Sequence, residues 1–164
     1  MATVLYPGSF DPIHLGHVDV IEQAAQLFGT VVVTTMHNPS KPSGLFSLDE
    51  RMAMIDECVA PMRAAGRSVR VEAFPGLAID AARALGADFI VKGLRSAGDL
   101  EVEQQMAHTN FTASGVRTVY IPCSPDRGFI SSRFIREIAQ YGGNVSAMVP
   151  PSVLFHLQRV SPPR

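Results

Sequence analysis

The sequence predicts an α/β domain with a parallel sheet of five strands and helices on both faces of the sheet. Short apolar, β-branched runs alternate along the chain with stretches in which apolar residues recur at helical spacing. This alternation is typical of strand–helix–strand units, which connect parallel strands through right-handed crossovers. The polar clusters of the chain also follow the strands, as expected where ligands bind at the carboxyl ends of a parallel sheet.

The first two strands and the first helix are predicted within the first 36 residues. An apolar run at residues 3–6 indicates a strand, and helical spacing indicates a helix at residues 15–28. The helix is expected to end at Gly29, because glycine readily adopts the left-handed conformation of a helix C-terminus. The valine- and threonine-rich run at residues 31–36 predicts a second strand that is covered on both faces.

A capping box predicts the start of the second helix. The Ser47 hydroxyl can accept a hydrogen bond from the Glu50 N–H, while the Glu50 carboxylate accepts one from the Ser47 N–H. Apolar residues then continue at helical spacing up to Gly66, the expected end of this helix. A third strand is predicted at residues 69–74.

The remainder of the chain repeats the alternation of strands and helices. Strands are expected at residues 89–91 and 118–121. Helices are expected at residues 77–85, at 99–112, from 129–132 to the glycines at 142–143, and at 153–160.

Length and composition indicate a single domain. The 164 residues fit one domain of ordinary size covering residues 1–164, and no linker long enough to divide the chain is present. Hydrophobic residues make up 46% of the chain and charged residues 18%, so a large core can form and disorder is not expected. Residues 161–164 are expected to form a loose tail.

Charge and apolar content argue against several classes of protein. The net charge is −1 and no basic run occurs, so no nucleic-acid partner is expected, and an anionic ligand would need a local cluster of cations. No stretch reaches the ~18 apolar residues of a membrane span, and no signal-peptide pattern is present. Cys58 and Cys123 show no metal-ligand spacing and are interpreted as reduced thiols. These features predict a cytoplasmic protein without membrane contact.

A polar cluster follows each predicted strand. In chain order the clusters lie at residues 9–17, at Lys41, at Ala78, at residues 92–95 and at residues 124–133. Imidazoles, cations, hydroxyls and helix N-termini would then meet at one edge of the sheet. Such groups suit the binding of a polyphosphate and the stabilisation of charge during phosphoryl-type transfer. Taken singly, each of these side chains is most simply explained as a capping or surface residue.

The segment at residues 8–17 carries the first resemblance to a known family. Its H-x-G-H spacing at residues 14–17, preceded by a strand and by Gly-Ser-Phe-Asp-Pro, resembles the phosphate-binding signature of the nucleotidyltransferase superfamily. Segments at residues 38–51, 92–110 and 129–132 are in turn similar to bacterial phosphopantetheine adenylyltransferases. The resemblance extends over residues 3–160 and implies a Rossmann-like, doubly wound fold.

The resemblance implies a reaction and its ligands. AMP would pass from ATP to 4′-phosphopantetheine, giving dephospho-coenzyme A and pyrophosphate, a step of coenzyme A biosynthesis. The acceptor phosphate would attack the α-phosphate in line, with Mg²⁺ held mainly by ATP oxygens and water rather than by protein ligands. A homohexamer and coenzyme A as a feedback inhibitor are also implied.

The resemblance also assigns residues to the site. His17 would stabilise charge on the α-phosphate in the transition state, with Lys41 and Arg95 as further catalytic residues. Residues expected to bind ATP are Ser9, Phe10, His17, Gly93, Leu94, Arg95, Glu103, Arg127, Gly128, Phe129, Ile130, Ser131, Ser132 and Arg133. Residues expected to bind the acceptor are Ser9, Lys41, Ala78 and Lys92.

Three departures from the family pattern leave alternatives open. Arg133 stands where Ser or Thr is common, Val102 where Tyr is common, and His14 where Thr is common. The roles of Arg133 and His14 are therefore open. Because H-x-G-H also occurs in nicotinate mononucleotide adenylyltransferases, that activity is the first alternative. The second is a nucleotide sensor without catalysis on the same fold.

Overall fold

The computed structural model describes residues 1–40 and 44–160 as five strands and six helices. The strands are β1 (Thr3–Gly8), β2 (Thr30–His37), β3 (Ser68–Pro75), β4 (Phe89–Leu94) and β5 (Arg117–Pro122). The helices are α1 (Leu15–Leu27), α2 (Leu48–Ala64), α3 (Ala78–Ala84), α4 (Ala97–Ser114), α5 (Ser132–Gln140) and α6 (Pro151–Val160).

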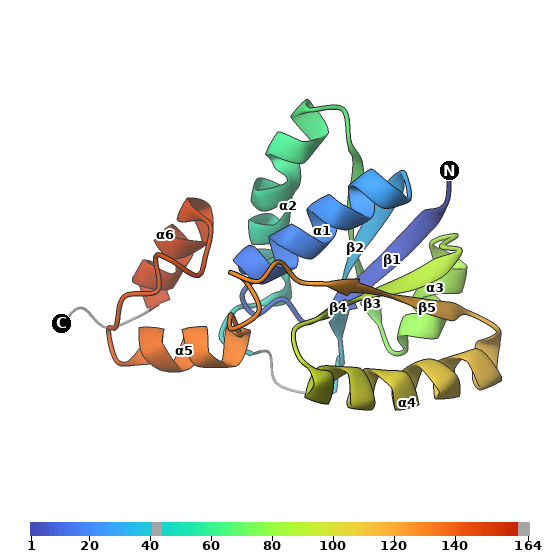
Figure 1. Ribbon diagram of the computed structural model, residues 1–164. Coiled ribbons are helices and arrows are strands. Elements are labelled where there is room, and N and C mark those ends of the chain that lie inside the picture. The colour runs from blue at the N-terminus through green and yellow to red at the C-terminus, as the bar shows by residue number, and fades with distance from the viewer. Residues whose placement is uncertain (41–43, 161–164) are drawn as a thin grey trace.

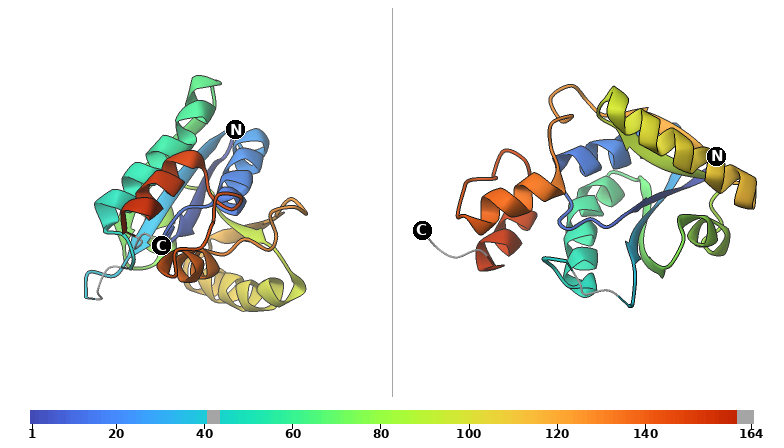
Figure 2. Two further views of the ribbon diagram at one scale, coloured as in Figure 1. Left: turned by 90° about the vertical axis from the view of Figure 1, so that its left-hand side faces the viewer. Right: turned by 90° about the horizontal axis from the view of Figure 1, so that it is seen from below.

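All pairs in the sheet are parallel, and the strand order is β3-β2-β1-β4-β5. Helices α1 and α2 cover one face, while α3 and α4 cover the other (Figures 1 and 2). The predicted Rossmann-like, doubly wound sheet is thus confirmed. Helices α5 and α6 lie beyond the end of the sheet at which β1 finishes, and α6 packs against α2 (Figure 1).

Two apolar clusters hold the layers together, one on each side of the sheet. The larger joins α1, α2, α5 and α6 to the sheet and includes Val33, Ile55 and Ile135, all fully buried. The smaller lies under α3 and includes Leu5 and Ile90. Because successive strand residues point to opposite faces, the apolar runs of β1, β2 and β4 supply both clusters.

Local sequence accounts for the helix boundaries. The predicted capping box is present in α2: Ser47 Oγ accepts from the Glu50 N–H at 3.3 Å, and Glu50 Oε2 accepts from the Ser47 N–H at 2.8 Å. Gly29 has φ of 108°, the left-handed conformation expected just after α1.

The prediction for β4 was too short. It ended at residue 91, whereas β4 continues to Leu94, because Lys92 and Gly93 pair with Tyr120 and Ile121 of β5. Backbone pairing therefore carries the strand through polar residues that local hydrophobicity does not mark. Similarly, α4 begins at Ala97 rather than residue 99, since Ser96 Oγ caps it by accepting from the Asp99 N–H at 3.3 Å.

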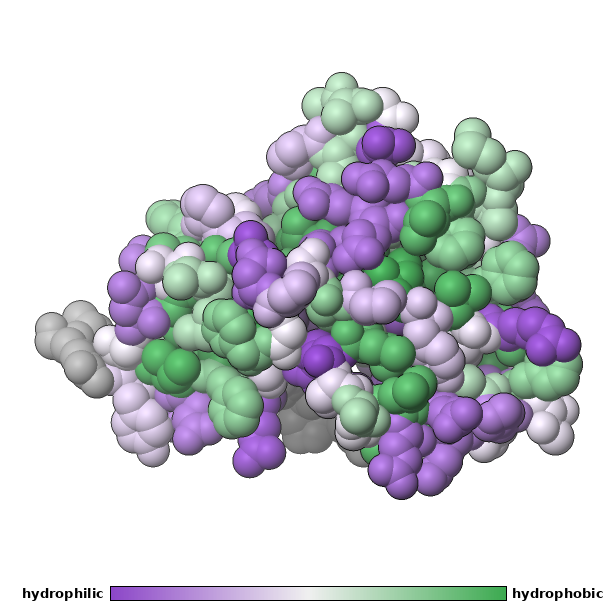
Figure 3. Space-filling model, in the orientation of Figure 1, coloured by the Kyte–Doolittle hydropathy of each residue, from purple (hydrophilic) through white to green (hydrophobic). Residues whose placement is uncertain are grey.

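The surface contains scattered apolar side chains. On the face shown in Figure 3, hydrophobic residues are interspersed with hydrophilic ones. Helix α4 differs from the other long helices because none of its residues is buried, and it exposes Leu100, Val102, Met106 and Phe111. No helix in the described part of the chain has both the length and the hydropathy needed to cross a membrane.

Candidate functional site

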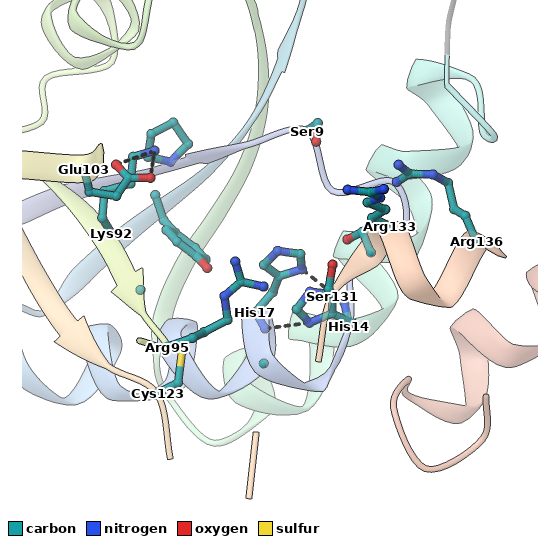
Figure 4. Close-up of a pocket in the computed structure, with 15 residues that line it drawn as sticks. Ser9, His14, His17, Lys92, Arg95, Glu103, Cys123, Ser131, Arg133 and Arg136 are labelled. Atoms are coloured by element: carbon teal, nitrogen blue, oxygen red, sulfur yellow. Dashed lines mark hydrogen bonds and ion pairs between the residues drawn. The ribbon is translucent and has the colours of Figure 1, made fainter. Parts of the chain in front are cut away.

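A cavity of about 360 Å³ opens where β1 and β4 end (Figure 4). Its wall is formed by the ends of β1 and β4, by the segments that directly follow β1, β4 and β5, and by the first two turns of α1, α4 and α5. The lining residues are Tyr6, Pro7, Ser9, His14, Gly16, His17, Lys92, Gly93, Arg95, Glu103, Cys123, Ser131, Ser132, Arg133 and Arg136. Segments far apart in the sequence therefore meet at one rim of the sheet, as expected for this fold.

The charge of this wall is strongly positive, although the chain as a whole has a net charge of −1. Four cationic side chains line it (Lys92, Arg95, Arg133 and Arg136) against one carboxylate, that of Glu103. Four minus one leaves three net positive charges in one cavity. This is the local cation cluster that an anionic ligand would require.

Two histidines form the floor of the cavity and cap α1 together. His14 is the N-cap residue, and its Nδ1 accepts from the His17 N–H at 3.3 Å. His17 Nδ1 in turn accepts from the His14 N–H at 3.2 Å. The two rings stack with centroids 3.6 Å apart and planes 17° from parallel. A capping box is thus built from two imidazoles instead of a hydroxyl and a carboxylate.

These hydrogen bonds fix the protonation of both rings. Because each Nδ1 accepts from a backbone N–H, the ring proton of each neutral imidazole lies on Nε2. Burial, reinforced by the nearby Arg95, lowers the pKa of His14 to about 3. Burial also lowers the pKa of His17 well below its usual value, with further contributions from His14 and Arg95. Both rings are therefore neutral Nε2–H donors.

Lys92 is held at one side of the cavity by Glu103. The Lys92 Nζ lies 3.3 Å from Glu103 Oε2, and both side chains are about three-quarters buried. Tyr120 donates from its hydroxyl to the backbone carbonyl of Glu103 at 3.2 Å, which fixes this turn of α4 against β5. The ammonium group is thus oriented before any ligand arrives.

Arg95 is held more firmly, by both oxygens of Asp99. Its Nε lies 2.9 Å from Asp99 Oδ2 and its Nη2 3.2 Å from Oδ1, and Nη1 donates to the Ile130 carbonyl at 3.3 Å. The bidentate pair sets the plane of the guanidinium. The third contact joins the segment after β4 to the segment before α5.

If Arg95 binds ATP as the family resemblance implies, replacing Asp99 by asparagine is expected to raise the KM for ATP by about threefold to tenfold. The pair is partly exposed, so its direct contribution is small, but its loss frees the Arg95 side chain. Steady-state kinetics with varied ATP would measure the change. Asp56→Asn, which breaks the exposed Arg63–Asp56 pair on α2, is the matched control. An unchanged KM in the Asp99 variant would contradict this role of Asp99.

The start of α5 supplies hydroxyls and backbone N–H groups. Ser131 is the N-cap residue but makes no side-chain cap bond, so its hydroxyl is not committed to the helix. Ser132 Oγ donates to the Pro12 carbonyl at 2.9 Å and thereby ties α5 to the loop after β1. Arg133 follows directly and lines the cavity. A helix N-terminus of this kind favours phosphate oxygens.

Most of the predicted site residues fall into two groups. Ser9, His17, Lys92, Gly93, Arg95, Glu103, Ser131, Ser132 and Arg133 line the cavity together. Leu94, Arg127, Gly128, Phe129 and Ile130 lie in the chain beside it without lining it, and Ile130 is fully buried. Lys41 lies outside the described residues.

Phe10 and Ala78 have structural surroundings of their own. The Phe10 ring is 2% exposed and packs edge-on against Tyr6 and His17, with centroids 5.5 and 5.0 Å away. It therefore supports the floor of the cavity from below. Ala78 packs at the start of α3 against the smaller core cluster and does not line the cavity.

Several lining residues were not predicted from the sequence. Arg136 is the most informative, because its Nη1 donates to the Asp11 carbonyl at 2.6 Å from the second turn of α5. The sequence signal for Arg136 was its spacing. It lies three residues after Arg133 and four after Ser132, so the three side chains are neighbours on one helix. Tyr6 gave no comparable signal, since it reads as an apolar strand residue. Cys123, which lies just after β5, was interpreted only as a reduced thiol.

The chain is similar to known proteins over most of its length. The sequence profile of the family described as cytidylyltransferase-like matches residues 5–138. A phosphopantetheine adenylyltransferase of Corynebacterium diphtheriae is 45% identical over 93% of this chain and 94% of its own length. Proteins of the same name are 46% identical in Heliobacterium modesticaldum, over 96% of this chain and 91% of that protein, and 44% identical in Crocosphaera subtropica, over 94% and 96%.

Proposed function

The chain belongs to the phosphopantetheine adenylyltransferases, a family of nucleotidyltransferases, and we propose that it transfers AMP from ATP to 4′-phosphopantetheine. The products would be dephospho-coenzyme A and pyrophosphate, in the adenylyl transfer step of coenzyme A biosynthesis. The observation that carries the proposal is the single cavity in which two neutral imidazoles, four cations and the start of α5 converge.

The proposed mechanism is direct in-line attack, in which the protein positions the reactants and stabilises charge. The ATP phosphates would lie against Arg95 and the N-terminus of α5, where Ser131 and Ser132 offer donors. His17 Nε2–H would donate to a non-bridging oxygen of the α-phosphate and strengthen this bond as negative charge develops. Lys92, which lies on the same side of the histidine pair as Arg95 in Figure 4, would orient the acceptor phosphate.

Mg²⁺ is proposed to reach the site with ATP. The one carboxylate that lines the cavity is that of Glu103, which is paired with Lys92, and no group of three potential ligands occurs among residues 1–40 and 44–160. This wall therefore fits an ion that is held mainly by phosphate oxygens and water, as Mg²⁺ prefers. When bound, the ion would neutralise phosphate charge beside the cations of the wall.

An acceptor panel tests the proposed function. Pyrophosphate release would be measured with ATP and 4′-phosphopantetheine, nicotinate mononucleotide or no acceptor. Release that depends on 4′-phosphopantetheine supports the proposal, whereas release with nicotinate mononucleotide alone favours the alternative adenylyltransferase. ATP binding by calorimetry without release for any acceptor would indicate a nucleotide sensor.

Replacing Lys41 by alanine is expected to raise the dissociation constant of 4′-phosphopantetheine by about tenfold or more, with a much smaller change for ATP. The expectation rests on the family resemblance of residues 38–51, because a lysine there would contribute a charge-assisted contact to the acceptor phosphate. Separate titrations with each ligand would decide it. A larger loss of ATP binding than of acceptor binding would contradict an acceptor role.

We also propose that the chain forms a homohexamer, as the resemblance implies, with α4 in a subunit interface. The support is that α4 buries none of its residues within the chain and exposes Leu100, Val102, Met106 and Phe111. Sedimentation is expected to give a hexamer for the unaltered chain and smaller species for Met106→Glu. A monomer at micromolar concentration would contradict the assembly.

Two further properties are proposed, the first on the same resemblance and the second on the composition of the chain. Coenzyme A would act as a feedback inhibitor, which is checked by adding it to the pyrophosphate-release assay. The protein would be cytoplasmic, in keeping with Cys58 and Cys123, which are both free thiols.

A further inference from the structure

The segment that connects β5 to α5, residues 123–131, includes residues 127–131, which are all expected to bind ATP. It forms turns rather than a helix or a strand, and Ile130 is its only buried residue. At this far end the Ile130 carbonyl accepts from Arg95 Nη1 at 3.3 Å. Because exposed turns are more mobile than the elements they connect, the near end of the segment also needs an anchor.

Asp19, in the second turn of α1, supplies this anchor. Its Oδ1 accepts from the Ser124 hydroxyl at 2.7 Å, and its Oδ2 accepts from the Ser124 N–H at 2.8 Å. Gln23, one turn later in α1, donates from Nε2 to Asp19 Oδ2 at 3.1 Å and to the Pro122 carbonyl at 3.2 Å. Helix α1 therefore holds the chain on both sides of Cys123, where it leaves β5.

Backbone hydrogen bonds extend this anchor through the segment. The Ser124 carbonyl accepts from the Arg127 N–H at 2.8 Å, and the Arg127 carbonyl accepts from the Ile130 N–H at 3.1 Å. The Ile130 carbonyl then accepts from Arg95. A continuous chain of contacts therefore leads from Asp19 to the guanidinium that is expected to meet the phosphates.

The charge of Asp19 would by itself oppose the binding of a polyphosphate. Asp19 forms no ion pair with any residue in the ranges 1–40 and 44–160. Burial raises the pKa of Cys123, which lines the cavity, and the negative charge of Asp19 raises it further. This charge therefore acts at the cavity wall, where it repels an anionic ligand. A favourable contribution of Asp19 to ATP binding must come from its hydrogen bonds instead.

We propose that Asp19 is a positioning residue, which fixes the segment between β5 and α5 for the binding of the ATP phosphates. The inference rests on the proposed function, in which these phosphates lie against Arg95 and the start of α5. Three donors meet the Asp19 carboxylate, and hydrogen bonds to a charged acceptor are stronger than neutral ones. Asp19 does not line the cavity, so it acts on the ligand through the segment that it holds.

Replacing Asp19 by alanine tests the proposal, because it removes all of these acceptors and alanine suits a helix. The dissociation constant of ATP is expected to rise by about tenfold. That of AMP, which lacks the β- and γ-phosphates, should be nearly unchanged. Loss of the charge alone would instead tighten ATP binding, so the direction of the change separates positioning from electrostatics. Asp19→Asn, whose amide oxygen can still accept from the Ser124 N–H, should restore most of the affinity.

Asp88 offers a matched control. Its Oδ2 accepts from the Thr3 N–H at 2.8 Å, at the opposite end of the sheet from the cavity. Asp88→Ala removes the same charge and a contact of the same kind, and it should leave ATP binding unchanged. If Asp19→Ala does not fold, Ser124→Ala removes the hydroxyl contact without a change of charge. It should weaken ATP binding by about threefold or more, and Ser124→Thr, which keeps a hydroxyl, should restore it.

Amide hydrogen exchange in the protein without ligand measures the positioning separately from the proposed function. Exchange at residues 124–130 is expected to be faster in Asp19→Ala than in Asp88→Ala or the unaltered chain. Unchanged exchange there would overturn the role of Asp19. So would ATP binding that is equal or tighter in Asp19→Ala, or that is weakened no more than AMP binding. Failure of the unaltered chain to bind ATP would count against the proposed function, while exchange would still show whether Asp19 holds the segment.

Discussion

Replacement of His17 by alanine is expected to lower kcat by roughly a hundredfold or more, while the dissociation constant of ATP changes little. The ring is a neutral donor, because its Nδ1 accepts from the His14 N–H and its pKa is lowered by burial. In the proposed mechanism, its neutral Nε2–H would form an ordinary hydrogen bond with the ground-state α-phosphate. The bond becomes stronger as charge develops on the oxygen, so the loss falls mainly on the transition state.

The measurement combines single-turnover rates with equilibrium titration of ATP. His156→Gln is a suitable control, because His156 lies on α6 and is 3.5 Å from Glu57, outside the cavity. A loss of ATP affinity as large as the loss of rate would show that His17 acts in ground-state binding. Unchanged stability of the variant at neutral pH is needed for the comparison, since His17 also takes part in the cap of α1.

The sequence was sufficient to predict the sheet and its two covered faces, because buried parallel strands are nearly continuous apolar runs. It was less informative where backbone pairing decides the structure. Lys92 and Gly93 lie inside β4 for that reason, although neither has a strand-like side chain. The fold itself then explains why the clusters after β1, β4 and β5 meet, since parallel strands end at the same edge.

The site was predictable to the extent that family motifs mark it. Motifs identify Ser131 and Arg95, but they do not show that Asp99 orients Arg95 or that Arg136 reaches the loop after β1. These contacts depend on distances between elements, which local spacing does not encode. The stacking of His14 on His17 was likewise not predictable from the sequence. Sequence spacing alone does not distinguish a histidine at the N-cap from one inside the helix.

The paired histidines should make the protein sensitive to acid. In the unfolded chain a histidine has a pKa near 6.5, whereas in the folded chain His14 has a pKa of about 3. Between these values the unfolded state binds more protons than the folded state, so the free energy of unfolding falls as the pH falls below about 6.5. For His14 alone the loss from pH 7 to pH 5 is about 2 kcal/mol, at 1.4 kcal/mol per unit over about 1.5 units.

A threonine at position 14 isolates this effect. Threonine is an adequate N-cap residue, so His14→Thr keeps an acceptor for the His17 N–H while it removes one titrating ring from the pair. Urea unfolding at pH 7 and pH 5 is expected to show a loss of stability in the variant that is smaller by about 2 kcal/mol. His37, His108 and His156 are present in both proteins and cancel in the comparison. The contradicting outcome is an equal loss of the free energy of unfolding in both proteins between pH 7 and pH 5. That result would mean that His14 binds a proton in the folded chain without a cost in stability. The neutral histidine pair of the proposed mechanism would then not persist.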